Sequence, residues 1–245
     1  MVSQEQLIHI SSEILKGFGE NEVNASLAAD CLVKADMRGI FTHGTYLLVT
    51  MFDRIQAGML EIPTKITKIQ ENNAITILDG GNGLGQLAAK KAMEISIEKA
   101  QEFGIAVTSV KNTNNISFLG YYTEMASQKG LIGIAASNAA PSMAPWGSSE
   151  AFIGTSPFSV SVPAKKEKPI IMDMSSSVVA RGKIRRALRN KEEIPLGWAI
   201  DQGGNPTTDP ETALKGTLMP IAGPKGSALA IVIDIICGML SGSLY

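Results

Sequence analysis

The sequence contains few of the side chains on which enzymes most often build metal or thiol chemistry. Only 2 of its 245 residues are histidine and 2 are cysteine. A disulfide framework or a metal site would need more of them at shorter spacing, so we expect no metal. Cys31 and Cys237 both lie in apolar helical patterns, and we expect a reduced, cytoplasmic protein.

An excess of one charge and a long apolar run are also absent. The formal net charge is -1, and the most basic stretch, 183–186, is short. We therefore expect neither nucleic acid nor an anionic membrane as a partner. The most apolar stretch, 228–240, contains Asp234 and is shorter than the roughly 20 residues of a membrane span. The composition, with 44% apolar and 18% charged residues, is typical of a globular protein.

The first part of the chain predicts a small helical domain over residues 1–65. Ser3 and Gln6 have the spacing of a capping box, which opens a helix. A second helix is expected over 22–37, and a third follows His43.

From residue 66 onward, the pattern alternates between strands and helices, which predicts a mixed α/β domain over 66–245. The expected strands are 74–78, 105–110, 131–136, 158–162 and 170–172. The expected helices are 84–103, 117–128, 209–215 and 224–241. Because the chain stops at Tyr245, directly after an apolar helix, we also expect this domain to lack a C-terminal part.

One of the two histidines occupies a distinctive position. His43 follows the end of the second helix and precedes Gly44, whereas His9 lies in an ordinary-looking helix. Histidine is the side chain best suited to moving a proton near neutral pH. Any histidine-based proton transfer is therefore expected to use His43.

The glycine-rich stretch 81–86 follows an expected strand and opens a helix, as a dinucleotide-binding fingerprint does. The fingerprint needs a third glycine where this chain has Gln86, and an acidic residue after the next strand, where it has Lys111. A glycine turn is the favoured interpretation.

Polar side chains follow several expected strands, where ligands collect in α/β sheets. Asn112–Asn115 and Asn138 could bind a ligand or satisfy a turn, and composition favours neither. The hydroxyls of 175–177 could bind a nucleotide or cap a helix. Lys225, at an expected helix N-terminus, could bind phosphate or remain a solvated cap residue.

A series of short stretches, which includes some of these motifs, together resembles one known family. The stretches are 35–40, 42–44, 120–122, 124–126, 138–147, 154–158, 173–174, 179–183, 206–210 and 223–226. In this order they resemble the type-2 malate/L-lactate dehydrogenase family, which includes ureidoglycolate, sulfolactate and 2,3-diketogulonate oxidoreductases.

The resemblance implies an oxidoreductase that transfers a hydride between NAD or NADP and a small 2-hydroxy or 2-oxo acid. It implies a mixed α/β fold that differs from the standard dinucleotide-binding fold, in agreement with the incomplete glycine fingerprint. It also implies a homodimer, and members of the family continue well past Ser241.

The resemblance carries over to individual positions with two departures. His43 matches the family's Ser-His-Gly histidine, with Thr42 in place of serine, and would act on the substrate oxygen. Asn115 occupies the place of a second family histidine, and asparagine cannot exchange a proton near pH 7. Leu47 stands where the family usually has an arginine suited to a substrate carboxylate.

The candidate site residues divide into three sets. The candidate catalytic residues are His43 and Asn115, the candidate cofactor-binding residues are Asp173, Met174, Ser175 and Lys225, and the candidate substrate-binding residues are Thr42, Asn138 and Ala139.

The departures at Leu47 and Asn115 keep a rival function open, namely a non-catalytic relative that binds a nucleotide or serves as a dimeric partner protein. A hydrolase or a metal enzyme is a weaker alternative, because no cluster of ligating side chains has metal-binding spacing.

Overall fold

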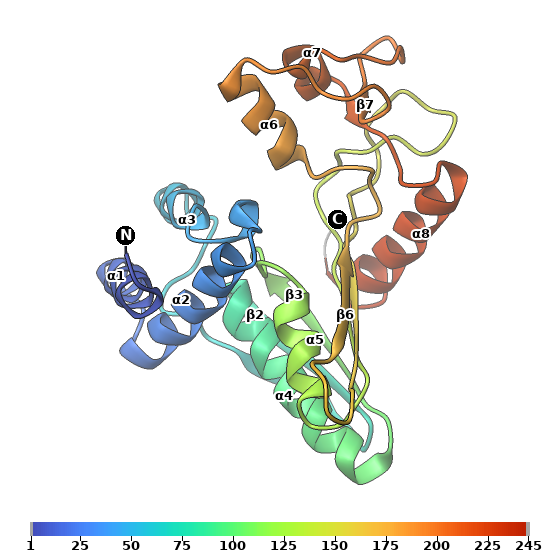
Figure 1. Ribbon diagram of the computed structural model, residues 1–245. Helices are drawn as coiled ribbons and strands as arrows, with labels where there is room; N and C mark the ends of the chain where they lie inside the picture. The colour runs from blue at the N-terminus through green and yellow to red at the C-terminus, as the bar shows by residue number, and fades with distance from the viewer. Residues whose placement is uncertain (1, 244–245) are drawn as a thin grey trace. The chain divides into compact units, whose positions relative to one another are not determined.

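The computed structural model describes residues 2–243, which form two compact units (Figure 1). The first unit contains 2–134, 160–172 and 241–243, and the second contains 135–159 and 173–240. Leu244 and Tyr245, which end the chain and prompted the expectation of a missing part, lie outside the described residues.

Three helices open the first unit, at the positions expected from the sequence. Helix α1 spans Gln4–Gly17, α2 spans Glu22–Met37 and α3 spans Leu47–Gln56. The capping box of α1 is formed, because the Gln6 amide donates to Ser3 Oγ at 3.2 Å and the Ser3 amide donates to Gln6 Oε1 at 2.9 Å. The predicted helix starts at both α1 and α2 are thus confirmed.

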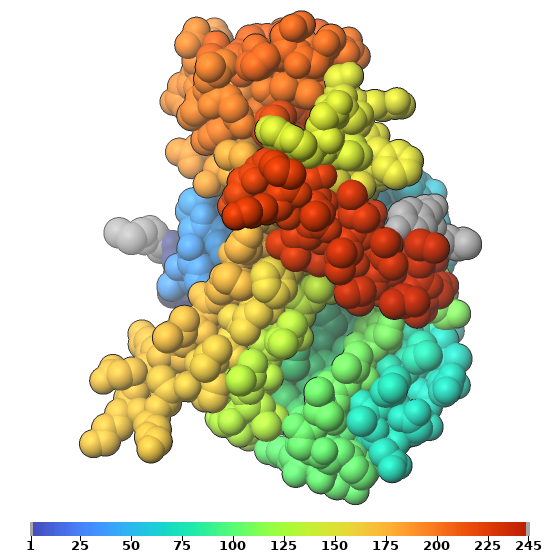
Figure 2. All heavy atoms as spheres, turned by 90° about the vertical axis from the view of Figure 1, so that its right-hand side faces the viewer, coloured from blue at the N-terminus to red at the C-terminus, as the bar shows by residue number. Residues whose placement is uncertain are grey.

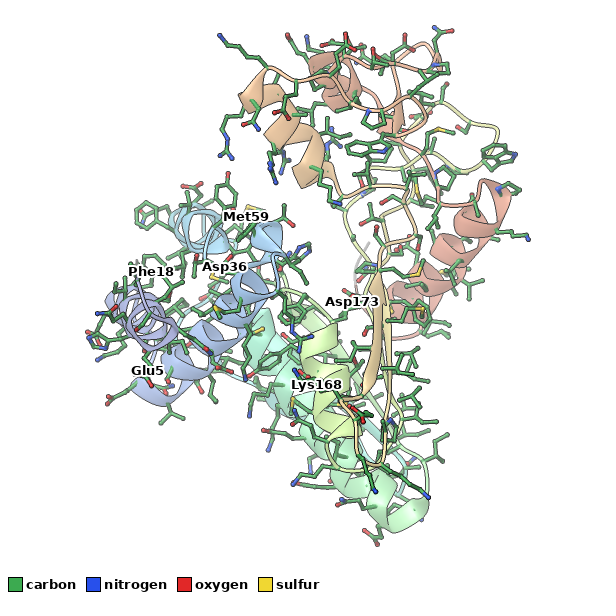
Figure 3. All side chains as sticks on the ribbon, viewed as in Figure 1. Glu5, Phe18, Asp36, Met59, Lys168 and Asp173 are labelled. Carbon is green, nitrogen blue, oxygen red and sulfur yellow. The ribbon has the colours of Figure 1, made fainter. Side chains whose placement is uncertain are left out.

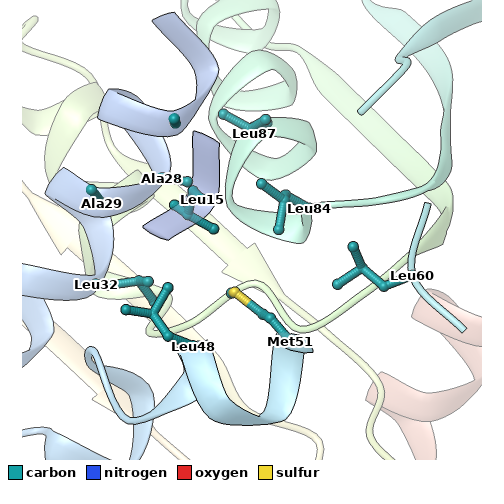
Figure 4. Packing of buried hydrophobic residues seen from close by; sticks show 10 residues of the cluster. Leu15, Ala28, Ala29, Leu32, Leu48, Met51, Leu60, Leu84 and Leu87 are labelled. Atoms are coloured by element: carbon teal, nitrogen blue, oxygen red, sulfur yellow. The ribbon is translucent and has the colours of Figure 1, made fainter. Parts of the chain in front are cut away.

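The core of this unit joins these helices to the next part of the chain. Leu15, Leu32 and Leu48 come from α1, α2 and α3, and they pack in one cluster with Leu84 and Leu87 at the start of α4, which spans Gly85–Phe103 (Figure 4). The compact unit therefore runs well past the expected domain boundary at residue 65, because the N-terminal helices bury their apolar faces against α4.

A three-stranded sheet packs against α4 through a separate apolar cluster of Leu78, Ala92 and Ile95. Its order is β1 (Thr67–Glu71), β2 (Ile75–Gly83), β3 (Val107–Thr113), with β2 antiparallel to β1 and parallel to β3. Helix α4 (Gly85–Phe103) makes the crossover from β2 to β3. The glycine stretch after residue 79 is the irregular end of β2, with a register shift between Asp79 and Gly83, rather than a separate turn.

A second three-stranded sheet has the order β4 (Gly133–Ala136), β5 (Phe158–Val162), β6 (Ile170–Met174), and α5 (Gly120–Ser127) precedes it. The boundary between the two units falls within each of these strands.

The second unit holds the remaining short elements. They are α6 (Arg181–Asn190), β7 (Ala199–Ile200), α7 (Pro210–Lys215), β8 (Thr217–Leu218), α8 (Pro224–Asp234) and a π-helical turn at Ile235–Met239. Their core contains Met143, Ile153, Ile184 and Leu218. The predicted mixed α/β fold is confirmed, and the described residues form three small sheets, the third made by β7 and β8, in place of the continuous parallel sheet of the standard dinucleotide fold. Within residues 2–243, none of the helices has both the length and the apolar character that a membrane crossing requires.

Candidate active site

The loop that carries His43 is attached firmly to α2. Asp36, near the end of α2 (Figure 3), accepts hydrogen bonds from the Thr45 amide at 2.9 Å and from the Thr45 hydroxyl at 2.6 Å. A Cβ atom on Gly44 would overlap the Asp36 carboxylate, so this turn needs glycine. These contacts anchor the loop between α2 and α3, in which His43 lies in a short 3-10 turn.

Two hydroxyl groups contact His43 itself. The Thr42 hydroxyl oxygen lies 2.9 Å from Nδ1 of the half-buried imidazole ring. The Ser117 hydroxyl donates to the His43 carbonyl oxygen at 2.6 Å. When the Thr42 hydroxyl donates to Nδ1, the proton of the neutral ring resides on Nε2. The bonding at Nδ1 thus sets which ring nitrogen can exchange a proton with a ligand.

Ser117 also connects His43 to the second candidate catalytic residue. The Ser117 amide donates to Asn115 Oδ1 at 2.7 Å, so one serine bridges the two segments. The structure therefore brings Thr42, His43 and Asn115 into one connected part of the first unit. Ser117 itself has a φ of +62°, a left-handed conformation that costs energy for a side chain other than glycine.

The residue that breaks the glycine fingerprint has a structural role here. Gln86 is buried, and its Nε2 donates to the Asn115 carbonyl oxygen at 3.0 Å. A Cβ atom on Gly85 would overlap the carbonyl oxygen of Asn114. The start of α4 therefore packs directly against the 114–115 backbone, and Gln86 holds Asn115 in place.

Asn114 serves the turn rather than a ligand in this structure. Its Oδ1 accepts a hydrogen bond from Arg54 Nε at 2.7 Å, and its Nδ2 donates to the Asn82 carbonyl oxygen at 2.7 Å. Arg54 lies on α3, 60 residues earlier. Sequence reasoning missed Arg54, Gln86 and Ser117, because a single arginine, glutamine or serine in a helix or turn gives no local signal of a distant partner.

The thiol nearest to this network is unreactive. Burial raises the pKa of Cys31 to about 11, so Cys31 is a neutral thiol near pH 7. Its Sγ lies 3.6 Å from the Tyr122 hydroxyl oxygen, and that hydroxyl donates to the Ile116 carbonyl oxygen at 2.5 Å. These contacts fix α2 behind the segment that leads to Ser117.

The candidate cofactor residues lie in the second unit. Asp173 and Met174 end β6, where Figure 3 labels Asp173, and Ser175 follows directly. The Ser175 and Ser177 hydroxyl oxygens are 3.0 Å apart, and the Ser177 hydroxyl donates to the Val179 carbonyl oxygen at 2.8 Å. Helix α6 begins after Ala180 with no side-chain cap. The interpretation of these serines as a helix cap is therefore wrong.

The same segment pairs with the chain that leads into α8. The Ile221 amide donates to the Ser176 carbonyl oxygen at 2.8 Å, and the Val178 amide donates to that of Met219 at 2.8 Å. These backbone bonds place the segment after β6 beside the entry to α8, whose first turn contains Lys225. A Cβ atom on Gly223 would lie 3.2 Å from the Trp146 ring, so the chain passes tightly over this indole.

The groups gathered here fit a nicotinamide dinucleotide. No side chain caps the N-terminus of α8. In its first turn the Lys225 amide is the donor left for a phosphate, because Pro224 has no N–H and the Gly226 amide donates to the Ile221 carbonyl oxygen. Lys225 is exposed, and its ammonium group has no acceptor among residues 2–243. A carboxylate, a hydroxyl and an ammonium are the side chains that suit ribose hydroxyls and phosphates. Asp173, Ser175 and Lys225 supply these three groups.

Asn138 and Ala139 also lie in the second unit. Burial raises the pKa of Cys237 to about 11, with a smaller opposing contribution from a hydrogen bond with the Asn138 backbone. Asn138 therefore lies beside the π-helical turn after α8. A Cβ atom on Gly154 would overlap the Ala139 carbonyl oxygen. The substrate role of both residues stays a prediction.

Comparison with known proteins identifies the fold and then the family. The fold matches that of the malate dehydrogenase of Entamoeba histolytica with a TM-score of 0.95 and 31% identity, over 100% of this chain and 72% of that one. The L-sulfolactate dehydrogenase of Methanocaldococcus jannaschii is 40% identical over 91% of this chain and 65% of its own length. The ureidoglycolate dehydrogenase (NAD(+)) of Escherichia coli O157:H7 is 34% identical over 98% of this chain and 68% of its own length.

The fold is thus that of a group of dehydrogenases. The malate/L-lactate dehydrogenase family matches residues 2–245, and the chain belongs to this family. It spans about two thirds of the length of the relatives that it matches.

Proposed function

We propose that this chain forms the catalytic and cofactor-binding part of an NAD(P)-dependent oxidoreductase, which interconverts a small 2-hydroxy acid and its 2-oxo acid. The observation that carries the proposal is the His43 loop. In a member of this dehydrogenase family, a histidine ring is fixed through Asp36, Thr42 and Ser117 and has the chemistry to exchange a proton.

The bound nicotinamide would supply the hydride chemistry that no amino-acid side chain provides. Asp173 and Ser175 would bind ribose hydroxyls, while Lys225 and the N-terminus of α8 would bind phosphate. His43 would give a proton to the developing alkoxide during reduction and take it back during oxidation. Asn115 would donate a hydrogen bond from Nδ2, because its Oδ1 already accepts from Ser117.

The substrate would be an acid of the malate/lactate type, and the cofactor NAD or NADP. The family match and the name of the NAD(+)-dependent relative support a nicotinamide. A cytoplasmic location stays a prediction, which rests on the low cysteine content of the sequence.

A homodimer is supported by the surface of the second unit. Apolar side chains of α8 and its π-helical turn are 39% to 75% exposed, and this segment lies at the front of the face in Figure 2. They are Ile231, Val232, Ile235, Ile236, Met239 and Leu240. Contiguous exposed apolar side chains mark interaction sites. Ile236→Glu should therefore shift the sedimentation coefficient toward that of a monomer, and an unchanged value would count against this interface.

The first experiment is a fluorescence titration with NADH and NADPH, followed by turnover with a panel of 2-oxo acids. Trp146 packs against Gly223 at the start of α8, so its emission should change when Lys225 binds a phosphate. His43→Ala should retain this binding and lose most turnover. His9→Ala, on α1, is the matched control and should behave as the unaltered protein does.

A second candidate function is a non-catalytic relative that binds the nucleotide. Leu47 and Asn115 motivate it, because each replaces a polar group expected from the family resemblance. Binding of NADH without oxidation by any 2-oxo acid would favour this alternative over the dehydrogenase.

A further inference from the structure

Helix α6 has a concentration of positive charge that is unusual in a chain with a formal net charge of -1. The stretch 181–191, which contains this helix and the residue after it, has six basic side chains and no acidic one. They are Arg181, Lys183, Arg185, Arg186, Arg189 and Lys191. None of the six forms an ion pair within residues 2–243. Within the described part of the chain, no carboxylate therefore neutralises this charge.

Three of the arginines lie along one side of α6. Arg181, Arg185 and Arg189 follow one another at intervals of four residues, which places them in successive turns of an α-helix. We call these three residues the arginine stripe. Arg185 and Arg189 are exposed and Arg181 is half-buried, so a ligand can reach the stripe from solvent.

The arginine stripe lowers the stability of α6 when it faces water alone. Like charges four residues apart on a helix repel each other, and Arg181 also lies in the first turn, at the positive end of the helix dipole. Burial lowers the pKa of Arg181, and the positive charge of Arg185 lowers it further. An anion bound between these side chains would offset both effects. The arrangement therefore favours an anion-binding function over a purely structural one.

The arginine stripe begins close to the candidate cofactor segment. Five residues separate Ser175 from Arg181, and the backbone between them is held because the Val178 amide donates to the Met219 carbonyl oxygen at 2.8 Å. Arg181 is held as well, because its Nη2 donates to the Leu214 carbonyl oxygen. The first turn of α6 therefore belongs to the same part of the second unit as the candidate cofactor residues.

We propose that the arginine stripe binds the 2′-phosphate of NADP, so that the protein uses NADPH in preference to NADH. This inference rests on the proposed cofactor site of the second unit. A guanidinium group donates two parallel hydrogen bonds to phosphate, and a phosphate monoester carries close to two negative charges at neutral pH. Arg181 and Arg185, one turn apart, supply two positive charges to match.

This assignment also decides which ribose Asp173 would bind. A carboxylate beside the adenosine ribose would repel a 2′-phosphate. Asp173 would therefore accept hydrogen bonds from the nicotinamide ribose, which carries no additional phosphate. The acidic and basic residues of the segment then serve opposite halves of the dinucleotide.

The preference for NADPH has a measurable size. Charge-assisted hydrogen bonds to the additional phosphate should make NADPH bind about 10- to 100-fold more tightly than NADH. Added NaCl should weaken NADPH binding more than NADH binding, because salt screens the exposed arginines. Fluorescence titration measures both affinities without any requirement for turnover.

The variant Arg185→Gln tests the assignment. It should lower the affinity for NADPH about tenfold and leave the affinity for NADH unchanged. Arg186→Gln is the matched control, because Arg186 is exposed on the same helix but lies about 100° around the helix axis from Arg185. The control removes the same charge and should leave both affinities unchanged.

Thermal unfolding gives a second readout. Without cofactor, the Tm of Arg185→Gln should not fall, because the change relieves the repulsion between Arg181 and Arg185. NADPH should raise the Tm of the unaltered protein more than the same concentration of NADH does, and Arg185→Gln should remove this difference. Inorganic phosphate should compete with NADPH more strongly than with NADH, because it can occupy the same stripe.

The outcomes separate this inference from the proposed function. Equal affinities for NADPH and NADH would overturn the inference and leave the dehydrogenase standing. Equal losses of NADPH affinity in Arg185→Gln and Arg186→Gln would also overturn it, because the effect would then come from net charge alone. If inorganic phosphate raises the Tm through Arg185 while NADPH and NADH bind equally, the stripe binds a free phosphorylated ligand and the inference is wrong. Absence of binding of both cofactors would overturn the proposed function, and the inference with it.

Discussion

Replacing Asp36 with alanine tests whether the carboxylate on α2 holds the His43 loop. The change removes two hydrogen bonds to Thr45, at 2.9 Å and 2.6 Å. Hydrogen bonds to a charged acceptor contribute about 1.5–3 kcal/mol each. Because Asp36 is half-buried and water can replace part of the loss, we expect a destabilisation of about 2–4 kcal/mol in total.

The activity of Asp36→Ala should fall more than its stability alone requires. A displacement of about 1 Å in a catalytic group can reduce the rate about 100-fold. We therefore expect kcat to fall about 10- to 100-fold at a temperature where the variant remains folded, with little change in NADH affinity. Urea denaturation and steady-state kinetics measure the two effects separately.

A double-mutant cycle with Gly44 sharpens this test. Gly44→Ala should be harmful because its new Cβ would overlap the Asp36 carboxylate. Once Asp36 is alanine, that clash is absent. The double variant should therefore lose much less stability than the sum of the losses in the two single variants. Additive losses, or an Asp36→Ala variant with unchanged stability and kcat, would refute the assignment of Asp36 to this loop.

Three further predictions concern Ser117, Lys225 and the buried thiols. Ser117→Ala should lower the free energy of unfolding by about 1–3 kcal/mol. Ser117→Gly loses the same hydrogen bond to His43 but relieves a φ of +62°, so it should be the more stable of the two variants in urea denaturation. Equal stability of the two variants would argue against strain at Ser117. Lys225→Gln should weaken NADH binding several-fold with no change in Tm. The control is Lys183→Gln, at another exposed lysine. Equal NADH affinities of the two variants would remove Lys225 from the cofactor site. Burial raises the pKa values of Cys31 and Cys237 to about 11 in the folded protein. The same thiols lose their protons at a lower pH in the unfolded chain than in the folded one, so the free energy of unfolding should fall between about pH 9 and about pH 11. The loss should be smaller in Cys31→Ala, and an identical pH dependence in that variant would contradict the assignment to Cys31.

Local signals in the sequence determined the helices that open the chain. The Ser3 and Gln6 pair places the start of α1, and the residues between Asn21 and Arg38 carry the capping and periodicity of α2. Pro210 at the first turn of α7 is a signal of the same kind. These elements were predictable because each boundary depends on residues within one or two turns of it.

Elements without such signals escaped prediction. Strand β1 is exposed along its whole length, so it shows no alternation of apolar and polar residues. Helix α6 is rich in basic residues and lacks a side-chain cap. Strands β7 and β8 have two residues each, which is too short for a periodic pattern.

For the site, the sequence by itself determined which residues are candidates, through the position of His43 and the resemblance to a known family, and their roles stay predictions. It could identify His43 from its rarity and its place between glycines. Only the tertiary structure decided how these residues are held, because the partners are distant in the chain. Ser117 contacts His43 across 74 residues, and Arg54 contacts Asn114 across 60. Such contacts depend on how helices and strands pack, and that packing is a property of the whole unit rather than of any local pattern.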